Sequence, residues 1–138
     1  MEFASAAQQA CYEKVAAMLK DLFGEMARPD DNNPVFMLPV GSTLAQISVF
    51  PWGDDDATIC TRAVVTIDSE INLDLCRFLL EENSKMRFGA FGLDSDDCVF
   101  FEHTIVGSTV DKGELKACVL AVASTADRYD DEIIRRWG

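Results

Sequence analysis

His103 is the only histidine in the chain, so any acid–base mechanism that uses a histidine must use this one. The nearest cysteine, Cys98, lies five positions earlier on the same predicted strand. Because side chains alternate across a strand, an odd separation points the two side chains to opposite faces. The sequence therefore places no nucleophile or orienting carboxylate beside His103, which favours a structural histidine and no enzymatic activity. The alternative that stays open is a small hydrolase-type enzyme in which the fold brings a carboxylate to His103.

Two acidic turns are the candidates for metal binding. Residues 94–97 read Asp-Ser-Asp-Asp, which resembles the start of a calcium loop. Such a loop needs an oxygen ligand at its fifth position and glycine at its sixth, where this chain has Cys98 and Val99. Residues 54–56 are three aspartates, again typical of a solvated turn. We therefore expect no metal site, with weak binding at these turns left open, and, since no phosphate-binding loop is present, no cofactor.

The overall charge excludes several classes of partner. The chain has 138 residues with 12 basic and 24 acidic side chains, a formal net charge of −12 and a pI near 4.3. Nucleic-acid binding needs basic side chains to neutralise phosphates, and an anionic membrane surface would repel this chain. We therefore expect neither partner. An acidic mimic of nucleic acid is ranked last, because the carboxylates fall mainly in separate turns rather than in one stripe.

The cysteines indicate a reducing compartment. There are five of them, at positions 11, 60, 76, 98 and 118, which is an odd number with no CxxC pair. No signal peptide opens the sequence, and no apolar stretch approaches the length of a membrane span. We therefore expect reduced cysteines in a cytoplasmic protein.

Hydrophobic periodicity predicts a single domain, residues 1–138, built from three helices and five strands. The first helix is expected over about Glu2 to Met26, a second begins after an N-cap at Asp68 or Asn72, and a third begins at the N-cap Asp111. Strands are expected at Val35–Val40, Leu44–Phe50, Thr58–Ile67, Met86–Leu93 and Cys98–Val106. Short turns between consecutive strands make them antiparallel. The fold class is therefore α+β, in the order α-β-β-β-α-β-β-α, with helices packed on an antiparallel sheet.

Apolar residues occupy both faces of the last predicted hairpin. Phe88, Phe91, Phe100 and Phe101 cannot all face one helix layer, because strand residues alternate sides. Something must cover part of the second face, either a helix of the same chain or a partner. We expect a homodimer whose interface includes these four rings, since a two-fold axis covers the same patch on both copies.

The first three strands supply candidates for contacts with another protein. These are the apolar side chains of Phe36, Leu38, Ile47, Val49 and Trp52. For any one of them, a place in the hydrophobic core is the favoured alternative. Binding through such strands leads us to expect a non-catalytic domain that engages a peptide segment or a partner protein.

Several short motifs in the second half of the chain resemble a known superfamily. They are Leu79-Leu80 followed by Asn83, Met86-Arg87-Phe88-Gly89, Leu93 to Val99, Asp111 to Leu115, and Ala126 to Ile133. In these motifs and in its order of elements, the chain resembles the type III secretion chaperone-like superfamily, and within it the YbjN branch most closely. The resemblance implies an α-β-β-β-α-β-β-α domain that is usually homodimeric. It also implies a chaperone-like role in which an extended client segment is held against apolar patches without nucleotide, although the residues themselves do not indicate secretion.

Overall fold

A computed structural model describes residues 1–138 as three helices and one six-stranded sheet. The elements follow in the order α1 (Ala6–Phe23), a 3-10 turn η1 (Gly24–Met26), β1 (Arg28–Pro29), β2 (Val35–Val40), β3 (Thr43–Trp52), β4 (Asp56–Thr66), α2 (Leu73–Asn83), β5 (Ala90–Leu93), β6 (Val99–Val106) and α3 (Lys112–Trp137). The predicted fold class and the predicted order of its eight main elements are therefore confirmed. The two-residue strand β1 is the one addition.

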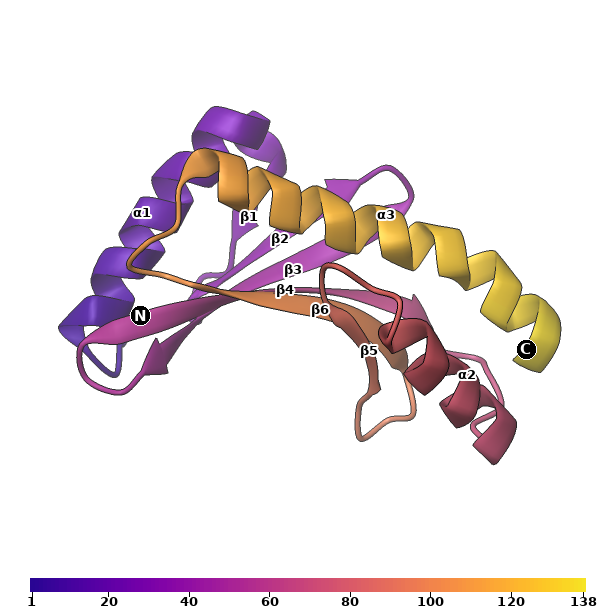
Figure 1. The fold of residues 1–138 in the computed structure, drawn as a ribbon. Coiled ribbons are helices and arrows are strands. Elements are labelled where there is room, and N and C mark those ends of the chain that lie inside the picture. The colour runs from indigo at the N-terminus through magenta and orange to yellow at the C-terminus, as the bar shows by residue number, and fades with distance from the viewer.

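The sheet is antiparallel throughout, in the order β1-β2-β3-β4-β6-β5. The longest helix, α3, runs along the sheet, with α1 near one end of it and α2 near the other (Figure 1). Side-chain oxygens cap the three helix starts: Ser5 accepts from the Gln8 N–H, Asn72 from the Leu75 N–H and Asp111 from the Glu114 N–H. Each cap satisfies a backbone donor that has no partner within its own helix.

All three helices pack on the same face of the sheet. One cluster of the core joins α1 and the first half of α3 to β2, β3 and β4, through residues such as Leu19, Leu115 and Ile59. A second cluster joins α2 and the second half of α3 to β4, β5 and β6, through residues such as Leu79, Ile133 and Phe101. The other face of the sheet has no helix on it.

Candidate functional site

The helix-free face of the sheet carries the even-numbered side chains of β3, of β4 as far as Val64, and of β6. Strand pairing sets them in rows across the sheet, because directly paired residues point to the same face. Gln46 pairs with Arg62 and Arg62 with Glu102, which gives a polar row at the centre. Ser48, Cys60 and Thr104 form the next row. A shallow hollow of about 330 Å³ lies over these two rows and reaches Phe50 and Thr58.

Large apolar side chains lie exposed on either side of that polar centre. Phe50 and Trp52 are 51% and 58% exposed near the β3–β4 turn, and Leu44 and Val64 are 53% and 51% exposed at the other end. Single exposed apolar residues are ordinary, but four on one helix-free face of a sheet are typical of a binding surface. We refer to Leu44, Phe50, Trp52 and Val64 together as the apolar face residues.

An ion pair organises the polar centre. The Arg62 guanidinium donates to Glu102 Oε2 from Nε at 2.9 Å, and its Nη2 lies 2.7 Å from the same oxygen. The guanidinium carbon also lies 3.8 Å from the centre of the Phe100 ring, which is a cation–π contact. Arg62 is therefore held flat against the sheet, where it fills the surface between the two apolar ends.

Cys60 lies beside this ion pair but is not a reactive thiol. Its Sγ donates to Glu102 Oε2 at 3.3 Å. Burial, and to a smaller extent the nearby Glu102 carboxylate, raise the pKa of the Cys60 thiol to about 11, although Thr104 and Arg62 lower it. At neutral pH Cys60 is therefore almost entirely in the protonated thiol form, whereas the thiolate is the nucleophilic form.

Four of the five predicted partner-contact residues lie in the core. Phe36, Leu38, Ile47 and Val49 are buried beneath α1 and α3, which corresponds to the core alternative for each of them. They point to the helix-covered face, and their neighbours one position along the strands point to the open one. Trp52 is exposed on the open face, so it alone of the five is available to a partner. The same alternation would have found Leu44, Phe50 and Val64, had the helix-covered face been known.

The rings proposed for a dimer interface divide between the two faces. Phe91 and Phe101 are buried in the second core cluster with α2 and α3. Phe100 points to the helix-free face but is only 8% exposed, because Arg62 covers its ring and Gly92 on the neighbouring strand leaves room for it. Phe88 is exposed. Of the four rings, only Phe88 therefore presents a large surface to a second copy.

His103 has no catalytic surroundings. Its ring meets the Phe88 ring edge-on, with 5.5 Å between the ring centres, on the helix-covered face where the paired Thr61 is fully buried. No ion pair joins His103 to a carboxylate. Cys98 lies in the turn before β6. The geometry that the hydrolase alternative requires is absent.

The acidic turn before β6 uses its first carboxylate for its own backbone. Asp94 Oδ1 accepts from the N–H groups of Asp96 and Cys98, at 2.8 and 3.0 Å. No group of three or more His, Cys, Asp or Glu side chains is arranged to hold a metal ion. None of the three helices is long and apolar enough to span a bilayer.

Both edges of the sheet are partly closed to added strands. At β5, the Phe91 N–H donates to Asn83 Oδ1 at 2.6 Å, and Asn83 Nδ2 donates to the Phe91 carbonyl at 3.2 Å. The amide of Asn83 thus takes the place that a neighbouring strand would occupy. At the opposite edge, β1 pairs with Phe36 and Met37 of β2. A partner strand would have to displace these contacts, because unpaired edge groups are what an added strand recognises.

The sequence and the fold each have counterparts among known proteins. Residues 9–138 match the family model TY-Chap1, described as T3SS (YopN, CesT) and YbjN peptide-binding chaperone 1. No curated protein matches the sequence.

Solved structures share the fold at low sequence identity. A chain of the HopA1–SchA chaperone–effector complex superposes with a TM-score of 0.67 at 9% identity, over 89% of this chain and 96% of that one. A chain of the ExsC–ExsE complex gives 0.66 at 16% identity, over 88% and 95%. The structure of the Yersinia pestis type III secretion chaperone SycH with a fragment of YscM2 gives 0.57 at 12% identity, over 88% and 98%.

Proposed function

The chain belongs to the TY-Chap1 family of T3SS (YopN, CesT) and YbjN peptide-binding chaperones, and we propose that it binds a segment of a client protein on the helix-free face of its sheet. Three structures of the same fold are complexes, one of them named as a chaperone with an effector and another as a secretion chaperone with a protein fragment. By analogy with these complexes, we expect the ligand of this chain to be a protein segment rather than a small molecule. The hydrolase alternative has no support in the family or in the surroundings of His103.

The observation that carries the proposal is the exposure of the four apolar face residues. Fully burying one side chain of this size contributes about 1.5–3 kcal/mol, and each of the four is about half exposed. Covering all four would contribute on the order of 3–6 kcal/mol before the ordering of the client is subtracted. A binding contribution of this size is compatible with reversible binding of an unfolded segment.

We also propose that the protein is a homodimer that pairs through the outer face of α2 and Phe88. Leu73 and Leu80 are seven residues apart, so they share one face of α2, opposite the buried Leu75 and Leu79. Leu73 is 74% exposed and Leu80 is 69% exposed. A helix that is apolar on both sides favours a contact with another chain.

Light scattering at high micromolar concentration tests the dimer. The unmodified protein should have twice the mass of one chain, and Leu80→Glu should be a folded monomer. Lys116→Glu on α3 is the control: it also makes the chain more negative, and by more than Leu80→Glu does, at another exposed helical position. This variant should remain a dimer. A monomeric unmodified protein would contradict the proposal.

We propose that the protein works in the cytoplasm. All five cysteines are free, and Cys11, Cys60 and Cys118 are buried. Unpaired thiols of this number are compatible with a reducing compartment.

Selection from a random peptide library displayed on phage tests client binding. We expect peptides that bind the unmodified protein, and that bind Phe50→Ser/Trp52→Ser at least about tenfold more weakly, since two half-exposed rings are lost. The side chains that are replaced are both exposed, so the thermal unfolding midpoint of the variant should stay within a few degrees of that of the unmodified protein.

A matched control removes two apolar side chains from another surface. Leu120 and Ile134 are partly exposed on α3, and Leu120→Ser/Ile134→Ser should bind the selected peptides as the unmodified protein does. A library that yields no binder, or binders that respond equally to both double variants, would refute the proposed surface.

A further inference from the structure

Strands β3 and β4 stop pairing with each other at the end of the hairpin that lies away from their turn. They pair from Trp52 and Asp56 as far as Ala45 and Ala63, yet β3 begins at Thr43 and β4 continues to Thr66. Over its last residues β4 is paired only with β6, with an irregularity between Val64 and Thr66. The β3 side of β4 therefore has no strand neighbour there, although β4 lies in the middle of the sheet.

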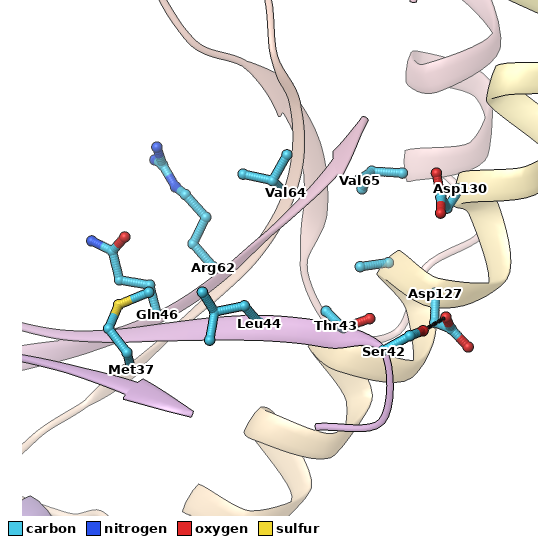
Figure 2. A pocket seen from close by; sticks show the side chains of 11 residues that line it. Met37, Ser42, Thr43, Leu44, Gln46, Arg62, Val64, Val65, Asp127 and Asp130 are labelled. Atoms are coloured by element: carbon cyan, nitrogen blue, oxygen red, sulfur yellow. Dashed lines mark hydrogen bonds between the residues drawn. The ribbon is translucent and has the colours of Figure 1, made fainter. Parts of the chain in front are cut away.

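A cavity of about 230 Å³ lies where the strands separate. Figure 2 shows Leu44 and Val64 on the two diverging strands, with Asp127 and Asp130 of α3 across from them. The cavity opens toward the helix-free face, since Met37, Gln46 and Arg62 of that face also line it. We call it the strand-gap cavity.

The charges around the strand-gap cavity are not balanced. Arg62 is its one basic lining residue and already pairs with Glu102. Asp127 accepts a hydrogen bond from Ser42 Oγ at 2.8 Å, and neither Asp127 nor Asp130 belongs to an ion pair. Burial raises the pKa of Asp130, and the neighbouring Asp131 and Asp127 carboxylates raise it further. Two carboxylates beside an apolar wall are complementary to a cation with an apolar stem.

We propose that the strand-gap cavity binds an arginine or lysine side chain of an extended client segment, with an apolar client residue beside it on Leu44 and Val64. This deepens the proposed function and rests on it. The cationic head would lie between Asp127 and Asp130, and the stem would lie along the apolar wall. The client backbone would approach the unpaired side of β4. A net charge of −12 on the chain favours the encounter with such a segment.

Two synthetic peptides test the cation directly. They are Ac-Ser-Val-Arg-Leu-Ser-amide and the same peptide with citrulline in place of arginine, which keeps the shape and removes the charge. Titration of the ¹⁵N-labelled protein should shift the amide signals of Val64, Val65, Asp127 and Asp130 with the arginine peptide. The citrulline peptide should bind about tenfold more weakly, as expected for the loss of a charge-assisted hydrogen bond.

The protein side is tested with Asp127→Asn/Asp130→Asn, which keeps both side-chain shapes. This variant should bind the two peptides equally. Asp54→Asn/Asp55→Asn removes the same charge from the turn at the other end of β3 and should retain the tenfold preference. Thermal unfolding of both variants establishes that they are folded.

Three outcomes would overturn the proposal: equal binding of the two peptides by the unmodified protein, a preference that survives in Asp127→Asn/Asp130→Asn, or shifts confined to residues outside the cavity. None of them affects peptides that bind at Phe50 and Trp52, so the proposed function would stand. A protein that binds no peptide of the library fails on the proposed function instead.

Discussion

Asn83→Ala removes the amide that closes the β5 edge, and we expect it to lower stability and to expose a strand. The half-buried Asn83 side chain makes two hydrogen bonds to the backbone of Phe91, at 2.6 and 3.2 Å. One such bond contributes about 0.5–1.5 kcal/mol, so the pair contributes about 1–3 kcal/mol. Alanine is the better helix former at the last residue of α2 and returns roughly 0.5 kcal/mol. The expected net loss is about 0.5–2.5 kcal/mol.

Urea denaturation followed by circular dichroism measures this loss. The midpoint should fall without a change in slope, because the surface exposed on unfolding is nearly the same. Light scattering of the folded variant should also show association that increases with concentration, since the Phe91 N–H and carbonyl become available to a strand of another molecule.

Gln9→Ala is the matched control for Asn83→Ala. It also removes a helical amide, but this one is exposed and makes only a 3.4 Å contact with Glu13. Its unfolding free energy should stay within about 0.5 kcal/mol of the unmodified protein. Equal stabilities of the two variants, with no association of either, would refute the conclusion that Asn83 closes this edge.

Two further predictions concern the packing of Phe100 and the buried thiols. A Cβ at Gly92 would lie 2.5 Å from the Phe100 ring, which Arg62 covers from another side, so Gly92→Ala should lower the free energy of unfolding by about 1–3 kcal/mol in urea denaturation. Gly113→Ala is the control, because its Cβ would meet nothing closer than 3.4 Å, and it should leave stability unchanged. Equal effects of the two substitutions would contradict the packing of Phe100. Burial raises the thiol pKa of Cys11, Cys60 and Cys118, for Cys60 from 9.0 to about 11, so the folded state disfavours the thiolates. The unfolding free energy should therefore be constant from about pH 7 to pH 9 and fall between pH 9 and 11, with a smaller fall in Cys60→Ala, and a stability that rises in this range would contradict the sign.

The order of elements could be predicted because each boundary has a local chemical signal. Asp111 was predicted as an N-cap and accepts from the Glu114 N–H at 2.7 Å, and Asn72 is the one of two predicted candidates that caps α2. The first helix begins later than predicted, at Ala6, because Ser5 takes the N-cap position. The predicted start of β5 at Met86 is wrong, since Gly89 has a φ of 77°, outside the extended region, and pairing begins at Ala90.

The binding surface could not be predicted in the same way, because it depends on which face the helices cover. Alternation separates Ile47 and Val49 from Ser48 and Phe50, but it does not say which set lies under a helix. Helices far away in the sequence decide this, through contacts of Val15 and Val119 with β3 and β4. For the more apolar set, which includes Ile47 and Val49, the sequence left two alternatives, contact with a partner or a place in the core. The structure places this set in the core.

The apolar excess on two faces of the last hairpin is partly covered within the chain itself. On the β5–β6 hairpin, the ring that points away from the helices is Phe100, and Arg62 of the neighbouring strand covers it. The exposed apolar surface of the helix-free face instead lies on β3 and β4, at Leu44, Phe50, Trp52 and Val64.

These two strands are central in the sheet, so a client that contacts them through side chains must lie across the face rather than extend an outer edge. The outer edges are restricted by Asn83 at β5 and by β1 at β2. The strand gap beyond Ala45 and Ala63 is the place where the open face also offers unpaired strand backbone. A segment that crosses the face and ends in the strand-gap cavity would use side-chain contacts and backbone contacts together, and the unpaired carboxylates of that cavity would then add specificity.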